Sequence, residues 1–428
     1  MNAAIIFVLL LALMLTGMPI SISLGLTVLT FLFGFTQVPL ESVALKLFTG
    51  IEKFEIMAIP FFILAGNFLT HGGVAKRMIR FASSMVGHWH GGLGLAGVLG
   101  CALFAAVSGS SPATVVAIGS ILLPAMTRAG FPKSFGAGVI TTSGALGILI
   151  PPSIVMVMYS VATNTSVGAL FMAGVVPGLA LATVLGGVTW YRARKFNYPR
   201  LPAASWAARG KAFRESLWGL LLIVIVMGGI YSGLFTPTEA AAMSAVYAFV
   251  VAVFVYKDMS LKDVPRVLLN SANMSAMLLY IITNAVLFSF IMTNENIPQT
   301  LADWMLGHGL GVITFLLAVN VLLLLAGNFM EPSSIVLIFA PILFPVAMKL
   351  GIHPVHFGII MVVNMEVGMC HPPVGLNLYV ASGITKMGIT ELTVAVWPWL
   401  LSMLGFLVVV TYWPGLSLWF PRLLGMVT

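Results

Sequence analysis

Two pairs of adjacent prolines interrupt apolar stretches of this sequence that would otherwise form long helices. They lie within two polar runs, TTSGALGILIPPS (141–153) and NMEVGMCHPPVGLN (364–377). Each pair removes two backbone donors and clashes with the preceding turn, so backbone carbonyls are left free. Two more short runs, SGSSPAT (108–114) and GNFMEPSS (327–334), join small and polar residues to a proline. The sequence thus gathers hydroxyls, amides and free carbonyls at four places.

Irregular backbone inside an apolar environment is tolerated only when it is buried in protein or lines a water-filled cavity. Free carbonyls and hydroxyls suit a hard cation such as Na⁺, and the N-terminal ends of half-helices suit a carboxylate. Because no Lys or Arg lies near these runs, helix ends, hydroxyls and amides must meet an anion. We therefore expect two cation sites with a substrate between them. The predicted substrate-binding residues are Thr114, Thr141, Ser143, Asn364, Glu366, His371 and Asn377.

Two carboxylates fall inside these polar runs, Glu331 and Glu366, and a carboxylate at membrane depth is a functional hypothesis by default. Three roles stay open for them: ligation of a cation, a hydrogen bond that holds the backbone, and proton transfer. His371, directly before the second proline pair, contacts substrate or makes a structural hydrogen bond. Glu239, in the segment TPTE, is typical of a helix start, where the helix dipole favours a negative charge.

The composition indicates an all-α polytopic membrane protein. Of the 428 residues, 60% are hydrophobic and 7% are charged, whereas soluble domains carry about 25% charged residues. The mean hydropathy is +1.08, and apolar runs of roughly twenty residues recur along the chain. The net charge of +8 is a topology signal, so we expect a lipid bilayer and no nucleic acid as partner. Residues 1–17 are interpreted as a first crossing rather than a removed signal. Cys101 and Cys370 lie in apolar segments and are expected to be buried free thiols.

The two halves of the chain share a pattern of glycines and prolines. An offset of 221 residues pairs Pro124 with Pro345 and Pro177 with Pro398, and also aligns the two proline pairs. Paired interruptions in two halves are typical of the binding site of a transporter. We place five crossings and one re-entrant hairpin in each half, about ten transmembrane helices in all. The predicted crossings are 3–18, 20–37, 56–72, 134–163 and 168–191, then 217–235, 238–256, 265–292, 354–385 and 390–413, with hairpins at 92–127 and 311–348.

Because five is odd, the second repeat (217–428) is expected to be inverted relative to the first (1–191), with a basic linker (192–216) between them. Orientation follows from the positive-inside rule. With the N-terminus outside, the inner side collects all of the 20 basic residues except four. These four are Lys46, Lys53, Lys349 and Arg422. Both termini are therefore predicted on the outer side, and the linker is predicted to be cytoplasmic.

In combination, four stretches resemble the large membrane subunit of tripartite ATP-independent periplasmic (TRAP) transporters. They are SGSSPATVVAIGSILLPAM (108–126), GALGILIPPS (144–153), EPSSIVLIFAPILFPV (331–346) and PPVGLNLYVASGI (372–384). The resemblance covers essentially the whole chain. It implies a transporter rather than an enzyme, in a bacterial inner membrane, so the outer side predicted above for both termini is the periplasm. It also implies the ion-transporter fold, with a scaffold and a mobile elevator domain that carries both hairpins.

The resemblance further implies Na⁺-driven uptake of an organic acid, delivered by a periplasmic substrate-binding protein, with a small four-helix membrane subunit alongside. The run EVGMCHPPVGLNLYVASGITKMGITEL (366–392) is similar to the C4-dicarboxylate branch, which takes succinate, malate or fumarate. Many members have Thr where this chain has His371, so hydroxyl ligation is not expected there. The cation-binding regions of the family fall on Ser108, Gly109, Ser110, Ser111, Gly144, Pro151, Gly327, Asn328, Glu331, Gly368 and Pro373.

Three alternative functions fit parts of the sequence. A stand-alone Na⁺- or H⁺-coupled anion carrier of the same fold would need no binding protein, and uptake by the chain without one would identify it. An intramembrane protease is suggested by VSGSS (107–111) and HPVH (353–356), but the sequence has no HExxH and no GxSG-type serine with a histidine at a matching site in a later crossing. A purely structural subunit would have no need of paired, polar, broken helices.

Overall fold

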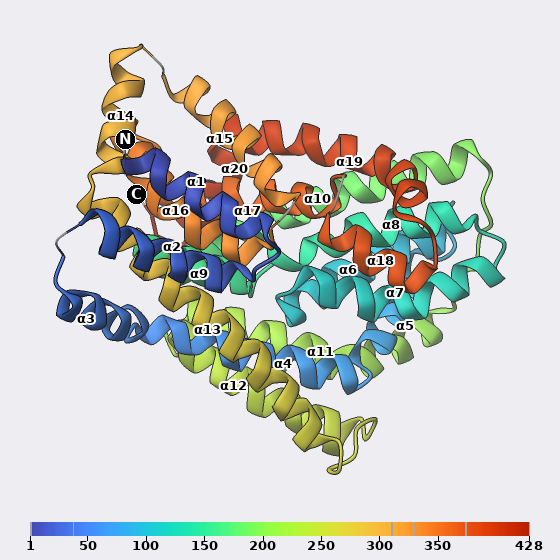
Figure 1. Cartoon of the computed structure of the whole chain (residues 1–428). Helices are drawn as coiled ribbons and strands as arrows, with labels where there is room; N and C mark the ends of the chain where they lie inside the picture. Colours follow the sequence, from blue (N-terminus) through green and yellow to red (C-terminus); the bar gives the residue numbers. More distant parts are fainter. Residues whose placement is uncertain (1, 37, 310, 329, 373–374, 428) are drawn as a thin grey trace.

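The computed structural model describes residues 2–36, 38–309, 311–328, 330–372 and 375–427, and every regular element among them is helical (Figure 1). The first half contains α1 (Asn2–Leu15), α2 (Ile20–Phe35), α3 (Leu40–Ile51), η1 (Phe54–Met57), α4 (Ala58–His71), α5 (Val74–Val86), α6 (Gly92–Ser108), α7 (Ser111–Arg128), α8 (Lys133–Gly144), η2 (Ala145–Ile148), α9 (Ile154–Thr163) and α10 (Val167–Lys195). The second half contains α11 (Trp206–Tyr231), α12 (Pro237–Val250), η3 (Val251–Val255), α13 (Val264–Asn294), α14 (Ile297–Gly307), α15 (Val312–Gly327), α16 (Pro332–Lys349), α17 (Pro354–Cys370), α18 (Leu376–Thr385), α19 (Ile389–Tyr412) and α20 (Gly415–Leu423).

Seven helical segments of the described chain are long and apolar enough to cross a membrane. Together they make the molecule a multi-pass membrane protein. The two predicted broken crossings appear as pairs of shorter helices, α8–η2 with α9 and α17 with α18. The number of ten crossings and the inversion of the second half stay predictions. The seven segments are Phe54–His71, Val167–Lys195, Trp206–Tyr231, Pro237–Val255, Val264–Asn294, Pro332–Lys349 and Ile389–Tyr412.

The connection between the halves is shorter than the predicted linker of residues 192–216. Helix α10 continues to Lys195 and α11 begins at Trp206, which leaves residues 196–205 outside helices. The hydroxyl of Ser205 accepts a hydrogen bond from the backbone N–H of Ala208 at 3.2 Å and so caps α11. Polar and basic residues with good helix propensity extend both helices beyond their apolar parts, which hydropathy alone does not reveal.

Helices begin in register in the two halves of the chain. Helices α7 and α16 start at residues 111 and 332 and end at 128 and 349, an offset of 221 at both ends. Each has a proline at its start, where a missing N–H costs nothing. The C-terminal turns of α9 and α18 also share one motif, in which the hydroxyl of Ser160 donates to the carbonyl of Thr165 and that of Ser382 to the carbonyl of Met387. The matching helix bounds of α7 and α16 thus follow the prolines that recur in the two halves of the sequence.

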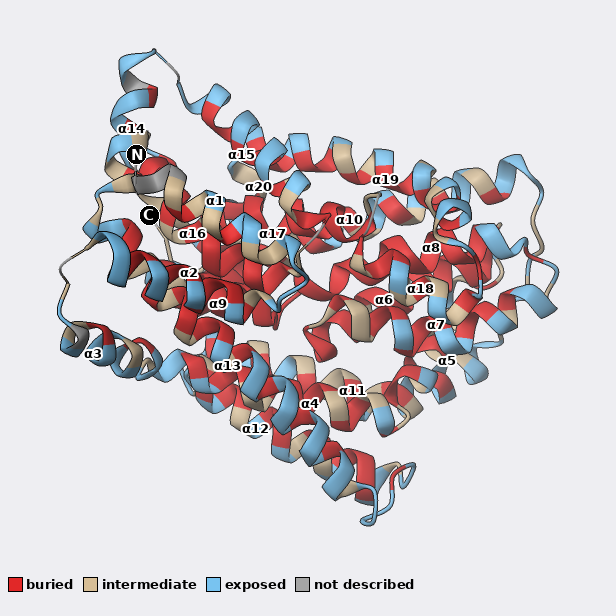
Figure 2. Ribbon diagram, viewed as in Figure 1, coloured by how far each residue is buried: buried red, intermediate tan, exposed pale blue. Residues whose placement is uncertain are grey.

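The two halves exchange the second parts of their broken helices. Helix α18 packs against α7 and α8 of the first half, whereas α9 packs against α16 and α17 of the second half. Figure 1 shows α6, α7, α8 and α18 gathered on one side, α9, α16 and α17 on the other, and α4, α11, α12 and α13 in a layer beneath. Buried residues concentrate around α6, α8, α9 and α17, whereas the layer beneath exposes many side chains (Figure 2). The core therefore surrounds the broken helices.

Candidate functional site

The turn between α6 and α7 forms the first hairpin tip, and its polar groups bond mainly to one another. The hydroxyls of Ser108 and Thr114 lie 2.9 Å apart. The carbonyl of Ser110 accepts from the Thr114 hydroxyl at 2.8 Å and from the Thr114 N–H at 3.1 Å. The left-handed backbone of Gly109, at φ 60°, closes the turn. The tip thus presents a compact set of oxygen atoms at the start of α7.

This first tip packs directly on the first broken helix. A Cβ atom on Gly147 would lie 2.6 Å from the carbonyl oxygen of Ser110 and 2.7 Å from the backbone nitrogen of Ser111. A Cβ atom on Gly109 would lie 2.8 Å from the carbonyl oxygen of Pro152. Two backbones therefore touch without side chains between them, and the predicted residues Gly144 and Pro151 flank this contact within the same buried segment. The first tip and the first break form one unit.

The second half repeats this arrangement with different partners. Gly327, at the end of α15, faces Gly368 of α17, and a Cβ atom on either would lie 3.0 Å from the other Cα atom. Asn328 Oδ1 lies 3.0 Å from His371 Nδ1, so His371 makes a structural hydrogen bond across tip and break. Glu331 occupies the N-cap position of α16, and its carboxylate accepts a long hydrogen bond from the Ser334 hydroxyl at 3.5 Å. Pro373, also predicted here, lies outside the described residues.

One buried side chain connects the two halves at the site. The amide of Asn377, at the start of α18, donates to the hydroxyl of Ser111 at 2.7 Å and to the carbonyl of Thr141 at 3.4 Å. The thiol of Cys370 donates to the same carbonyl at 3.4 Å. Cys370 and Cys101 are buried free thiols, as predicted. The first tip, the end of α8 and the second break thus converge on one cluster.

The remaining predicted polar residues are buried inside helices. Asn364 donates to the backbone and side-chain oxygens of Asn320, both at 3.0 Å, and Asn320 donates to Thr411 at 2.9 Å. Glu366 is fully buried one turn before Cys370, and within the described part of the chain neither of its carboxylate oxygens has a hydrogen-bond partner. The hydroxyl of Ser143 is likewise buried with no partner there. These orphaned oxygens are unexplained by packing alone.

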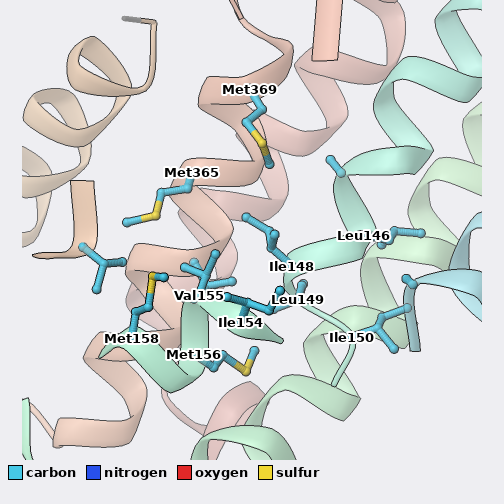
Figure 3. Packing of buried hydrophobic residues seen from close by; sticks show 14 of the residues in the cluster. Leu146, Ile148, Leu149, Ile150, Ile154, Val155, Met156, Met158, Met365 and Met369 are labelled. Carbon is cyan, nitrogen blue, oxygen red and sulfur yellow. The ribbon is translucent and has the colours of Figure 1, made fainter. Parts of the chain in front are cut away.

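A cavity of about 390 Å³ lies where the two hairpin tips meet the layer of α4 and α13. Its wall includes the first residues of both α7 and α16, and its one ionisable group among the described lining residues is Glu331. Ile148 and Met369 contribute its apolar floor. Figure 3 shows the side chain of Met369 of α17 extending toward Ile148 of the first break. Both halves of the chain therefore build one cavity.

A larger cavity of about 810 Å³ lies between α1, α14, α15 and α16, and its lining is almost entirely apolar. It offers a charged substrate few hydrogen-bond partners, and burying a charge without partners is costly. The smaller cavity between the tips, which we call the tip cavity, is the better candidate for a polar or anionic ligand.

Of the predicted cation-binding residues, Ser108, Gly109, Ser110, Ser111 and Glu331 line the tip cavity, and the others within the described residues lie in the two contacts of tip and break. None of the seven predicted substrate residues lines it. Three unpredicted polar residues do, namely Asn67, Thr70 and Ser333. Asn67 donates to Ser271 of α13 at 2.8 Å. A polar pair inside the apolar span of α4 was the signal that could have identified Asn67 and Thr70.

These features define a membrane transporter: a multi-pass helical protein holds two broken helices and two polar tips, with a cavity between the tips. The sequence matches the family described as "Tripartite ATP-independent periplasmic transporter, DctM component" over residues 7–416. The chain belongs to this family of transporter components, so it is not an enzyme and resides in a bacterial inner membrane.

Two curated relatives and one solved structure illustrate the likeness. The "C4-dicarboxylate TRAP transporter large permease protein DctM" of Rhodobacter capsulatus is 77% identical, over 100% of both chains. The protein of the same name from Pseudomonas aeruginosa is 55% identical, over 94% of this chain and 95% of that one. The YdaH transporter of Alcanivorax borkumensis has a TM-score of 0.63 at 17% identity, covering 90% of this chain and 89% of that one. At that identity the structural likeness supports the fold alone.

Proposed function

We propose that this chain imports a C4-dicarboxylate, such as succinate, malate or fumarate, through the tip cavity. The names of its two curated relatives support this substrate class. The observation that carries the proposal is that the N-terminal ends of two half-helices, α7 and α16, open into one cavity. Each helix N-terminus stabilises a carboxylate by about 0.3–1 kcal/mol, and by up to about 2 kcal/mol when partly buried. A ligand with two carboxylates uses both ends.

Hydroxyl and amide groups complete the proposed substrate site. Ser110 and Ser333 lie at the two helix starts, and Asn67 faces the same cavity from α4. These donors fix the orientation of a carboxylate without adding charge. The cavity wall has no Lys or Arg among its described residues, so a dianion entering alone would meet the single carboxylate of Glu331. Binding of the dianion therefore requires a cation nearby.

We assign that cation to Na⁺, held at the two contacts of tip and break. The first contact offers the carbonyl of Ser110 and the hydroxyl of Ser108, and the second offers Asn328 and Glu331. Oxygen donors of this kind suit a hard cation. The orphaned carboxylate of Glu366, buried next to the cluster of Asn377, is available for a proton or a further cation. Cation binding and dianion binding then reinforce each other through charge.

Transport would proceed by an elevator movement of the hairpins and broken helices against the layer of α4 and α13. The protein would act with a periplasmic substrate-binding protein and a small four-helix membrane subunit, and both of its termini would be periplasmic. The basic residues from Arg192 to Arg214 are consistent with that orientation, because such clusters stay on the cytoplasmic side.

The proposal is tested with the purified chain and its small membrane subunit in lipid vesicles. Uptake of ¹⁴C-succinate is measured with and without an inward Na⁺ gradient, and a cognate periplasmic binding protein is added last. We expect uptake that requires both the gradient and the binding protein. Uptake without the binding protein would instead identify a stand-alone carrier, and uptake driven by a pH gradient alone would transfer the coupling role from Na⁺ to Glu331 or Glu366.

A further inference from the structure

A separate, basic pocket of about 550 Å³ lies between α5, α11 and the end of η3, and it shares no lining residue with the tip cavity. Five cationic side chains line it, Lys76, Arg77, Arg80, Lys211 and Arg214. Only two carboxylates accompany them, so the described lining carries a net charge of +3. A pocket with this surplus calls for an anion of higher charge than a single carboxylate.

The two carboxylates are already engaged. Asp258 pairs with Arg77, and Glu215 accepts from Arg80 at 2.6 Å. The guanidinium of Arg77 also lies over the ring of Tyr256, 3.8 Å from its centre. The remaining three cations, Lys76, Lys211 and Arg214, have no acidic partner within 4 Å among the described residues. Two arginines are thus fixed in place, while three cations on two neighbouring helices stay exposed.

The pocket lies at the boundary between a charged and an apolar part of the protein surface. Helix α11 is charged up to Glu215 and then continues as the apolar stretch LWGLLLIVIVMGGIY, which starts at Leu217. Trp218, 43% exposed, lines the pocket at this boundary, and Phe254, 54% exposed, directly precedes its lining residue Val255. Exposed aromatic and aliphatic residues below a ring of cations match a lipid, with its headgroup above and its acyl chains below.

We propose that this pocket binds an anionic phospholipid, with its phosphates on Lys76, Lys211 and Arg214 and its acyl chains along α11 and α12. A surplus of three cations fits a headgroup with two phosphodiesters, as in cardiolipin, better than one with a single phosphodiester. Basic pockets between membrane helices on the cytoplasmic side bind such headgroups. The proposed lipid site shares no lining residue with the tip cavity, so it does not depend on the proposed transport cycle.

The test uses the full chain with its small membrane subunit in detergent, titrated with tetraoleoyl cardiolipin, dioleoyl phosphatidylcholine or inorganic phosphate and followed by native mass spectrometry. The pocket variant is Lys76→Gln/Lys211→Gln/Arg214→Gln. The matched control, Lys133→Gln/Lys262→Gln/Lys386→Gln, removes the same charge from exposed positions elsewhere on the predicted cytoplasmic side. Since each cation near an anionic headgroup contributes about fivefold, we expect cardiolipin affinity to fall on the order of a hundredfold in the pocket variant.

The control variant should bind cardiolipin as the unaltered chain does, and phosphatidylcholine should bind weakly to all three proteins. Equal cardiolipin binding by the pocket variant, or an equal loss in the control, would overturn the proposal. Saturation by inorganic phosphate that blocks cardiolipin would show that the pocket takes a phosphate ion instead of a lipid. If the pocket variant fails to fold, two further measurements test the proposal. The variant Lys76→Arg/Lys211→Arg preserves the charge of the pocket and must still bind cardiolipin. The unaltered chain must bind cardiolipin more weakly at high salt, because salt screens the attraction between the cations and the headgroup.

Discussion

Replacing Gly147 by alanine tests whether the contact of the first tip with the first break holds a cation. The added Cβ atom would lie 2.6 Å from the Ser110 carbonyl oxygen, so an ordinary contact of 3.4 Å requires a movement of 0.8 Å. The obstructing atoms belong to the backbone of Ser110 and Ser111 and have no alternative rotamer. Overpacking of this kind costs about 1–3 kcal/mol. Ligand distances in ion sites are held within about 0.2 Å, so the shift also displaces the Ser110 carbonyl from a bound cation.

The assay is Na⁺-dependent succinate uptake in vesicles, with thermal unfolding measured on the same preparation. If the strain of about 1–3 kcal/mol falls on the cation-bound form, the half-saturating Na⁺ concentration rises about 5- to 150-fold. The controls are Gly383→Ala in α18 and Gly405→Ala in α19, where an added Cβ atom meets nothing within 4 Å. Both should leave Na⁺ dependence unchanged and stabilise their helices by about 0.5–1 kcal/mol.

Two results would refute the reasoning. If Gly147→Ala retains the Na⁺ dependence of the unaltered chain, the tip contact does not form a cation site. If it lowers thermal stability but also raises the half-saturating succinate concentration without affecting Na⁺, the contact belongs to the substrate site instead.

Three further predictions concern the second half of the site. Gly327→Ala brings a Cβ atom to 3.0 Å from the Cα atom of Gly368, so its effect on half-saturating Na⁺ should be smaller than that of Gly147→Ala in the same uptake assay. His371→Gln keeps a partner for Asn328 and should keep the KM for succinate, whereas His371→Leu should lose about 0.6 kcal/mol of stability in thermal unfolding; a raised KM in the glutamine variant would place His371 in the substrate site. Glu331→Gln removes the negative charge from the tip cavity, so calorimetry should detect succinate binding with a weaker Na⁺ requirement; an unchanged requirement would exclude Glu331 from coupling.

The organisation of the fold could be predicted from the sequence because glycine and proline mark the ends of its helices. Their recurrence at one offset predicted both hairpins, and α7 and α16 indeed begin and end 221 residues apart. The sequence predicts a helix start at Glu239, and the structure confirms it, because Thr236 and Glu239 form a capping box at α12. Helix caps and helix ends can be predicted from the sequence because they depend on residues only a few positions apart.

The partners within the site could not be predicted in the same way. Asn377 bonds to Ser111, a residue 266 positions earlier, and no local pattern encodes that pairing. Polarity in an apolar run indicates a buried polar contact but does not say whether the contact is a ligand or another side chain. Asn364 and Asn67 illustrate this ambiguity. Asn364 donates a hydrogen bond to Asn320 and does not line the tip cavity, whereas Asn67, in a less conspicuous run, lines that cavity.

The exchange of half-helices explains why the site must move as a whole if it moves at all. Because α18 is packed against α7 and α8, and α9 against α16 and α17, a shift of one hairpin alone would separate it from the broken helix of the other half. The hydrogen bonds of Asn377 to Ser111 and Thr141 would break in the same step and leave buried polar groups unpaired. Both hairpins and both broken helices therefore form the smallest unit that can shift without exposing these groups. The contact of that unit with α4 and α13, where the tip cavity lies, is then the surface along which the proposed elevator movement slides.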